Sequence, residues 1–412
     1  MSRRLVLGLV LVSVSASAEG VKTFLDAAEQ GNVDRRISIE QRNRAAAEYR
    51  QAWTSLFPSL SVTAGWTHNQ YGAPPPLDKV VPQDQFDVYF RFDLPLIDVQ
   101  RWFRMSTSGA AEGSAELREM VTRDAVRRQV VASFYGYAAS LAFMESAKKS
   151  ASVAAEQLRL MEIRASVGTV TELDLLRARA EVSRTKQVVA DMVSLVATSR
   201  RTVRTLTDLE PPDTLPLPVD DVSPSAPLPE MEARIEELPA VKAADKDAQA
   251  AGTIATGSKL ALVPSLSAQF TQRITNATGF TGQPASYNAG INLNWRLDVP
   301  TFMGMQAQSA NEQAALLLGD RTRLQARDQI NSDWQRLQAA LIKIEAATAQ
   351  VEAARRATQV ARDRYAAGVA TQLDVIQAER DVFGAEVSQI QARTELATAR
   401  ASLRISAALP LE

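Results

Sequence analysis

Residues 167–182 read VGTVTELDLLRARAEV, and residues 367–382 read AGVATQLDVIQAERDV. The two stretches share a glycine, a threonine, a leucine and an aspartate, and each matched pair stands 200 positions apart. The pairs are Gly168 and Gly368, Thr171 and Thr371, Leu173 and Leu373, and Asp174 and Asp374. A motif that occurs twice in matching halves of a chain indicates an internal duplication.

Each copy of the motif has the composition of one helix end followed by one helix start. Glycine readily adopts the left-handed conformation that ends helices, so Gly168 and Gly368 are expected to stop a helix. A threonine followed three residues later by an acid resembles a capping box, and the acid also suits a helix N-terminus. The motif therefore predicts the tips of two helical hairpins, with turns at 168–171 and 368–371.

Long stretches without proline surround both tips, from residue 96 to 210 and from residue 301 to 409. A helix from about residue 104 to 167 would be roughly 95 Å long at about 1.5 Å per residue. After each turn, apolar residues recur seven positions apart, which predicts left-handed coiled coils. These residues are Leu175, Val182, Val189, Val196 and Val203, then Val375, Val382, Leu396 and Leu403, with Ala378, Ala385, Ala392 and Ala399 on the second seam.

Four shorter segments alternate between apolar and polar residues. They lie near residues 58–69, 85–95, 264–273 and 286–299. In the second segment, for example, Val88 and Phe90 alternate with Tyr89 and Arg91. A period of two with one apolar face predicts strands that face two different media.

The duplication extends beyond the tips and defines the domain organisation. The string PSLS at 58–61 returns at 264–267, and FRFDLP, ending at Pro95, is matched with WRLDVP, ending at Pro300. Each half is expected to run helix, strand, strand, long helix, tip, helix. The repeats occupy residues 19–209 and 237–412, and the segment 210–236, rich in proline and acid, is expected to join them as a linker.

The first residues, MSRRLVLGLVLVSVSASAEG, have the order of a secretory signal. Arg3 and Arg4 precede an apolar run and an A-x-A site that ends at Ala18. The run is well below the roughly 20 residues of a membrane-spanning helix. Residues 1–18 are therefore predicted to export the chain and to be removed.

The alternating strands allow two interpretations, a soluble sandwich and an outer-membrane sheet. The export signal, strand lengths near roughly 9–11 residues and a polar face on every strand favour the membrane. Four strands do not close into a barrel, and an open edge in lipid leaves backbone groups unpaired. The chain is therefore expected to share its barrel with copies of itself. Three copies would give about twelve strands and two copies, the competing solution, about eight.

Composition removes several classes of function. The 46 basic and 47 acidic residues nearly cancel, which gives no indication of nucleic-acid binding. The chain has no cysteine and one histidine, His68. This composition excludes thiol chemistry, disulfides, Cys/His zinc sites and histidine-based catalytic triads. No carboxylates cluster with metal-ligand or acid/base spacing. No cofactor, metal or enzymatic activity is therefore expected.

The paired G-x-x-T-x-L-D tips, the PSLS strand starts and the D-x-P strand ends resemble the TolC family of outer-membrane efflux and secretion channels. The resemblance implies a mixed α and β membrane protein: a homotrimer with a transmembrane β-barrel of twelve strands, four from each protomer, continued by a periplasmic tunnel of coiled helices. It also implies docking of the tips on a periplasmic adaptor (membrane fusion protein). That adaptor would join an inner-membrane transporter of the RND, ABC or MFS type.

The resemblance assigns roles to residues near the tips. The adaptor-docking tips would consist of Gly168, Thr171, Leu173, Gly368, Thr371 and Leu373. Asp174, Tyr365 and Asp374 would form the entrance gate and charge filter, since acid rings select cations in pores. Helix capping alone is the alternative role of the two aspartates.

Two departures from the family concern that gate. Ala370 and Gln377 stand where the family has an arginine and a second acid. The entrance is therefore expected to be held more loosely, or by Arg164 and Arg364, which precede the tips symmetrically.

The sequence thus favours a passive exit duct in the bacterial outer membrane, serving a tripartite efflux pump or a type I secretion system. The alternative is an exported coiled-coil scaffold or tether without a pore.

Overall fold

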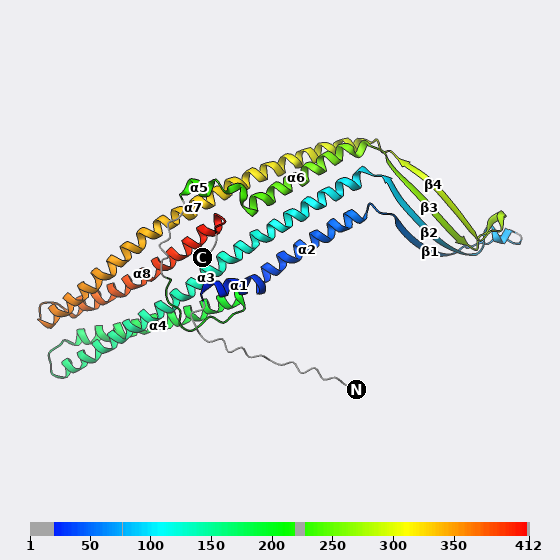
Figure 1. Cartoon of the computed structure of the whole chain (residues 1–412). Helices are drawn as coiled ribbons and strands as arrows, with labels where there is room; N and C mark the ends of the chain where they lie inside the picture. The colour runs from blue at the N-terminus through cyan, green and yellow to red at the C-terminus, as the bar shows by residue number, and fades with distance from the viewer. Residues whose placement is uncertain (1–19, 76, 219–226, 410–412) are drawn as a thin grey trace, which may run out of the picture. The chain divides into compact units, whose positions relative to one another are not determined.

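The computed structural model describes residues 20–75, 77–218 and 227–409 (Figure 1). The predicted secretory signal, residues 1–18, lies outside the described residues. The chain divides into two compact units. The strand unit comprises Ser38–Val121 and Glu236–Gln325, and the helical unit comprises Met1–Ile37, Thr122–Ile235 and Ala326–Glu412.

The strand unit contains one antiparallel sheet with the order β1-β2-β3-β4 (Figure 1). Its strands are β1 (Ser59–His68), β2 (Asp84–Ile97), β3 (Ser265–Thr275) and β4 (Ala285–Asn294). Ser61 lies opposite Arg91, and Arg91 lies opposite Thr271, so polar residues of neighbouring strands share one face. The four predicted strands, two from each repeat, are confirmed.

The two faces of this sheet differ in chemistry. Trp66 and Ile291 belong to the apolar face, and 66% and 70% of their surfaces are exposed. On the polar face, Arg273 Nε donates a hydrogen bond to Asp87 Oδ1 at 2.9 Å. The same guanidinium lies 5.7 Å from the centroid of the Tyr89 ring. The polar face is therefore linked by its own side chains, whereas large apolar side chains of the opposite face remain in contact with solvent.

Helices of the strand unit approach one another closely. They are α2 (Val33–Thr54), α6 (Pro239–Lys259) and the beginnings of α3 (Val99–Ser166) and α7 (Val299–Ala366). Arg42 of α2 forms an ion pair with Glu119 of α3 at 2.7 Å. A Cβ added to Gly257 of α6 would lie 2.8 Å from Phe103 Cγ of α3, so only glycine permits this contact. Short 3-10 helices are Leu77–Lys79, Ile235–Glu237, Leu260–Leu262 and Gly279–Thr281.

The fourth strand ends earlier than predicted. We expected it to reach residue 299, but β4 ends at residue 294. Asp298 Oδ1 accepts a hydrogen bond from the backbone N–H of Thr301 at 3.0 Å, and Asp98 Oδ1 accepts one from Arg101 at 3.1 Å. Both aspartates start a long helix, so Asp298 corresponds to Asp98. Asp93 lies inside β2, and the matching of FRFDLP with WRLDVP was therefore wrong.

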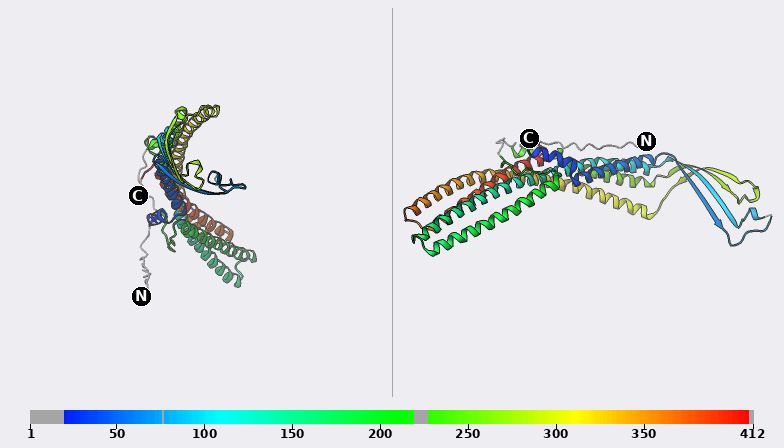
Figure 2. Two further views of the ribbon diagram at one scale, coloured as in Figure 1. Left: turned by 90° about the vertical axis from the view of Figure 1, so that its right-hand side faces the viewer. Right: turned by 90° about the horizontal axis from the view of Figure 1, so that it is seen from below.

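The helical unit contains two long hairpins, which lie side by side with their tips at the same end (Figure 2). The first joins α3 to α4 (Glu172–Thr207), and the second joins α7 to α8 (Gln372–Ser406). The unit also holds α1 (Val21–Gly31) and α5 (Leu228–Glu232), and α5 falls inside the segment predicted as a linker. None of the described helices combines the length and the apolarity that a membrane crossing requires.

The main core of the helical unit forms where α1 packs against α3 and α4. Phe24 of α1 is fully buried, and its ring centroid lies 5.1 Å from that of Phe134 of α3. Tyr137 of α3 is also fully buried, and its hydroxyl donates to the carbonyl of Pro212 at 3.0 Å. Along α8 most of the predicted seam is buried, which confirms the heptad pattern there. The buried seam residues are Val375, Ala385, Ala392, Leu396, Ala399 and Leu403.

Replacing the core aromatic ring should destabilise the helical unit strongly. Phe24→Ala removes a fully buried ring, and such truncations cost about 3–5 kcal/mol. The control Val193→Ala changes a side chain that is half exposed on α4 and should change the unfolding free energy by less than about 0.5 kcal/mol. Denaturant unfolding in detergent, followed by helical circular dichroism, measures both. Equal effects of the two substitutions would contradict this assignment of the core.

Candidate functional site

The two tips share one backbone conformation. Gly168 has a φ of 75° and Gly368 a φ of 76°, the left-handed conformation predicted for both. In the residue after Gly168, the N–H of Thr169 donates to the carbonyl of Arg164 at 3.0 Å. In the residue after Gly368, the N–H of Val369 donates to the carbonyl of Arg364 at 2.9 Å. These bonds satisfy carbonyls at the ends of α3 and α7, as glycine-terminated helices require.

The threonine and aspartate of each tip start the following helix. The hydroxyl oxygen of Thr371 accepts from the N–H of Asp374 at 3.3 Å, and Asp374 Oδ2 accepts from the N–H of Thr371 at 2.7 Å. These two bonds complete a capping box. Thr171 accepts from the N–H of Asp174 at 3.2 Å, but Asp174 Oδ2 accepts from the hydroxyl of Thr171 instead of its N–H. The predicted caps are confirmed, with a full box only at the second tip.

The capping bonds also change the acidity of Asp374. The N–H of Thr371, and then its hydroxyl, hold the pKa of Asp374 below its usual value, with a smaller contribution from Arg364. Because the pKa is lowered in the folded protein, this contribution to tip stability is present above the unfolded-state pKa. It is lost as the pH falls through the folded-state pKa.

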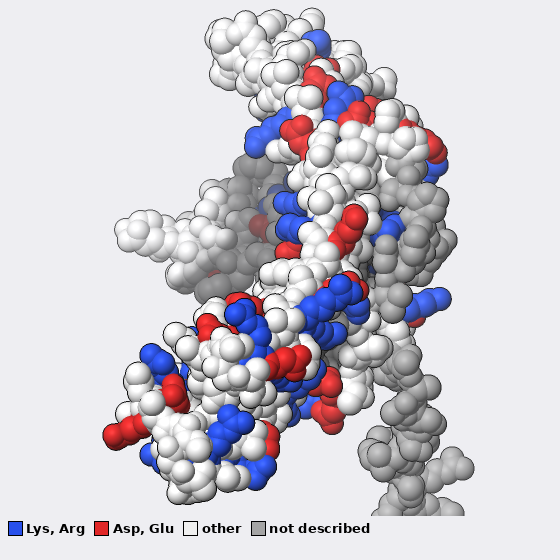
Figure 3. Space-filling view, turned by 90° about the vertical axis from the view of Figure 1, so that its left-hand side faces the viewer, with Lys and Arg blue, Asp and Glu red and all other residues white. Residues whose placement is uncertain are grey.

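Apolar side chains project from both tips. Leu173 is 55% exposed and Leu373 is 47% exposed, and the valines beside the two glycines are exposed as well. Figure 3 views the hairpin tips end on and shows basic and acidic residues interspersed with uncharged surface. Exposed apolar residues at matching places of both repeats are suited to packing against another protein.

The predicted gate residues make contacts of two kinds, across the hairpins and within one tip. The hydroxyl of Tyr365 donates to Met161 Sδ at 3.5 Å, and the guanidinium of Arg164 lies 5.3 Å from the centroid of the Tyr365 ring. The hydrogen bonds of Asp174 stay at its own tip, and Arg177 of the same helix is 3.7 Å away. Of the two arginines expected near the gate, Arg164 therefore reaches Tyr365 across the hairpins.

A groove runs beside this contact between α3 and the second hairpin. Its volume is about 480 Å³, and most of its lining is apolar. Leu160, Met161 and Val375 contribute to its walls together with Arg164 and Tyr365. The tips thus carry both exposed apolar side chains and an adjacent apolar groove.

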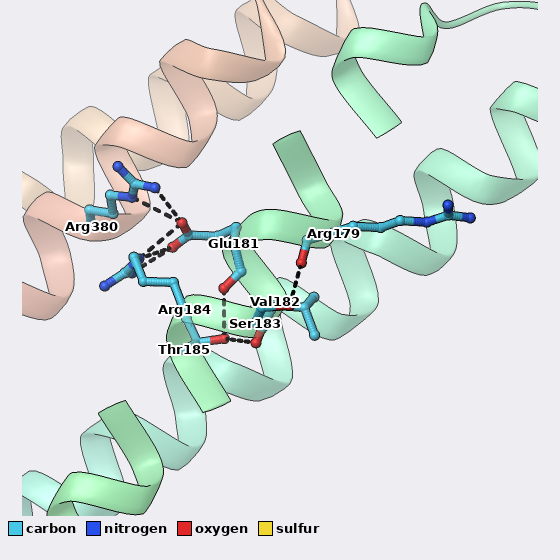
Figure 4. A network of polar contacts seen from close by, with 7 residues as sticks. All are labelled: Arg179, Glu181, Val182, Ser183, Arg184, Thr185 and Arg380. Carbon is cyan, nitrogen blue, oxygen red and sulfur yellow. Dashed lines mark hydrogen bonds and ion pairs between the residues drawn. The ribbon is translucent and has the colours of Figure 1, made fainter. Parts of the chain in front are cut away.

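A buried carboxylate joins the two hairpins a few turns behind the tips. Glu181 of α4 has a side chain that is only 9% exposed. Its Oε2 accepts hydrogen bonds at 3.0 Å from Nε of Arg184 on α4 and from Nε of Arg380 on α8 (Figure 4). Burial would raise the pKa of Glu181, but the bonds from Arg184 and Arg380 outweigh burial and lower it.

Two glutamates of α8 are shared between the hairpins in a similar way. Glu386 accepts from Arg355 of α7 at 2.8 Å and, across the hairpins, from the hydroxyl of Ser146 of α3 at 2.8 Å. Glu379 accepts from Arg362 Nε of α7 at 2.8 Å and from the amide of Gln157 of α3 at 3.5 Å. The sequence pattern does not predict these contacts, because charges spaced along a helix are usually solvated.

Other parts of the described chain offer little chemistry. No group of three His, Cys, Asp or Glu side chains lies together as metal ligands within the described residues. His68, the single histidine, pairs its Nδ1 with Asp84 Oδ1 at 2.8 Å, where β1 meets β2.

An open sheet with an uncovered apolar face, combined with coiled-coil hairpins, defines a channel-type outer-membrane protein. The sequence profile of the outer membrane efflux protein family matches residues 25–208 and 232–408, and the chain belongs to this family. The resemblance found in the sequence is therefore confirmed. Members of this family are outer-membrane channels and not enzymes.

Several solved structures share the fold. The outer membrane channel CmeC of Campylobacter jejuni is 16% identical, covers 94% of this chain and 85% of its own, and has a TM-score of 0.83. VceC of Vibrio cholerae is 16% identical over 95% of this chain and 97% of its own, with a TM-score of 0.78. The open-state MtrE channel of Neisseria gonorrhoeae is 14% identical. The match covers 94% of this chain and 89% of the MtrE chain, with a TM-score of 0.78. No curated relative matches the sequence.

Two glycine substitutions should have opposite effects on the second hairpin. Gly368→Ala forces a Cβ into a left-handed conformation, which should destabilise the tip by about 1–2 kcal/mol. Gly384→Ala, in the interior of α8 where an added Cβ meets open space, should stabilise the helix by up to about 1 kcal/mol. Hydrogen exchange of the α7 and α8 amides near the tip measures both. Slower exchange in Gly368→Ala would show that the tip conformation is wrongly assigned.

Proposed function

We propose that this protein is the outer-membrane exit duct of a tripartite efflux pump or a type I secretion system, acting as a homotrimer. The observation that carries the proposal is the open sheet of the strand unit. Its strands expose large apolar side chains on one face and place linked polar side chains on the other. Apolar outside and polar inside is the pattern of a transmembrane barrel that surrounds water.

Closure of the barrel supports a trimer. β1 and β4 are the edges of the sheet in its strand order, and an open edge in lipid costs several kcal/mol for each unpaired backbone group. Three copies provide about twelve strands, enough for a closed cylinder around a water-filled lumen. Two copies would provide about eight, whose interior is just wide enough for side chains to fill it.

The protein acts as a passive conduit in this proposal. The helical hairpins form the periplasmic part, and their tips, with exposed Leu173 and Leu373, dock on the hairpins of a periplasmic adaptor. The adaptor connects the duct to an energised inner-membrane transporter of the RND, ABC or MFS type, which selects the substrate. The structure of MtrE in an open state supports an entrance that changes conformation in this family.

Membrane fractionation and planar-bilayer recording test the proposal together. The protein should fractionate with the outer membrane, require detergent for extraction, migrate as a heat-modifiable trimer and conduct ions. A monomer that remains soluble without detergent and never conducts would favour the exported scaffold or tether instead.

The tip aspartates should give the duct a preference for cations. Asp174→Ala combined with Asp374→Ala should reduce the ratio of cation to anion permeability, because acid rings attract cations. Since the bonds from Thr371 lower the pKa of Asp374, the contribution of Asp374 to this preference should be fully present at about pH 5 and should weaken only below the usual aspartate pKa.

Reversal potentials in a salt gradient measure this preference. The matched control, Thr171→Ala with Thr371→Ala, removes the caps and keeps both carboxylates, so its selectivity should remain close to that of the wild type. If the double aspartate variant kept the wild-type selectivity, the two residues would serve as helix caps only.

A further inference from the structure

The hydrogen bonds of the tip motifs stay within their own hairpins. Asp374 bonds to Thr371, and Asp174 bonds to Thr171, so neither capping aspartate ties one hairpin to the other. Polar contacts that cross between the hairpins among the described residues include those of Tyr365 with α3, close to the turn. Further from the turns they include those of three carboxylates, Glu181, Glu379 and Glu386.

These three carboxylates follow one pattern. Each binds an arginine of its own hairpin and, at the same time, a polar group of the other hairpin. The arginines of the same hairpin are Arg184 for Glu181, Arg362 for Glu379 and Arg355 for Glu386. The groups on the other hairpin are Arg380, Gln157 and Ser146, respectively. We call this set the shared-carboxylate ladder.

The pattern changes the energetics of separating the hairpins. Removing the only partner of a buried carboxylate is strongly unfavourable, because the charge is left buried and unpaired. In the ladder, every carboxylate would keep its own arginine after the other hairpin moved away. The contacts across the hairpins therefore hold the two hairpins together. They can still break without leaving a buried carboxylate that has no arginine partner.

Glu181 makes the strongest contact of the ladder across the hairpins. Its partner there, Arg380, is a fully ionised side chain at 3.0 Å, and Glu181 itself is buried. By comparison, Glu379 meets a neutral amide at 3.5 Å, and Glu386 meets a neutral hydroxyl and the more distant Lys149 at 3.8 Å. Bonds between two charged groups are roughly twice as strong as neutral ones.

We propose that the contact between Glu181 and Arg380 is the main link that holds the entrance closed, and that opening breaks it while Arg184 retains Glu181. Glu181 and Arg380 are thus positioning residues for the gate. The proposal rests on the proposed channel function, and it places the decisive link behind the tips, in the ladder, and not at the capping aspartates.

A pair of arginine variants tests the link in planar bilayers with the full-length protein. Arg380→Gln removes the contact across the hairpins and leaves Glu181 paired with Arg184. It should raise the open probability by at least about tenfold, because each of the three protomers loses one hydrogen bond between charged groups. Arg184→Gln removes the partner on the same helix and keeps the link, so the channel should remain closed. Arg380→Lys should restore much of the closure.

Thermal unfolding of each variant separates gating from general damage. A merely structural role would lower the melting temperature in both glutamine variants without a difference in open probability. Equal open probability in wild type, Arg380→Gln and Arg184→Gln would contradict the proposed role of the link without contradicting the proposed channel function. Absence of any conductance in all of them, including the wild type, would overturn the duct and the link together.

Cross-linking provides a second and independent measurement. The chain has no cysteine, so Glu181→Cys with Arg380→Cys creates the sole thiol pair. A short bis-methanethiosulfonate reagent, which forms a disulfide with each cysteine and releases methanesulfinate, should hold the entrance of this variant closed, and a reductant that cleaves these disulfides should then raise its conductance above that of the untreated wild type. Conductance that is unchanged by cross-linking and by reduction would contradict the proposal.

Discussion

The constraint on which this protein depends is backbone hydrogen bonding at the edges of a four-stranded sheet. β1 and β4 are the outer strands, and within the described part of the chain one side of each has no neighbouring strand. In water such edges are hydrated, but in lipid each unpaired group is costly. The apolar residues exposed on one face of the same sheet belong in lipid. In the proposed duct, further copies of the chain satisfy both requirements, so the proposed barrel, pore and oligomer share one physical cause, the open edges of the single sheet.

The helical unit combines rigidity and movement in different places. Where α1 covers α3 and α4, the core is made of fully buried aromatic and aliphatic side chains such as Phe24 and Val130. Closer to the tips, small seam residues such as Ala385 are accompanied by charged links between the hairpins. Apolar packing resists separation in proportion to its area, whereas a few polar contacts allow two discrete arrangements. A gate near the tips is therefore physically reasonable, and a gate within the core is not.

Much of the fold could be predicted from the sequence, because local patterns determine it. Alternation specified the four strands, and Gly168 and Gly368 specified the tips. The end of β4 was predicted too late because Trp295 and Leu297 continue the alternation of apolar and polar residues. In the structure, Asp298 caps the start of α7 instead. The ladder was beyond sequence reasoning: Glu181 and Arg380 are 199 positions apart, and neither is unusual until packing buries the carboxylate. The roles of the tip residues in docking and selectivity remain predictions.

Cross-linking between the edges of neighbouring sheets tests the shared barrel most directly. Thr63→Cys on β1 would be combined in turn with Ser286→Cys, Asn288→Cys or Asn292→Cys on β4, in a chain that has no other cysteine. Within one chain these strands are separated by β2 and β3, or roughly 14 Å at about 4.8 Å per strand, so a disulfide forms only between copies. If three chains share the barrel, oxidising membranes that contain these variants should yield disulfide-linked dimers and trimers and nothing larger. Exclusively monomeric protein, or products that stop at dimers, would contradict a barrel shared by three chains.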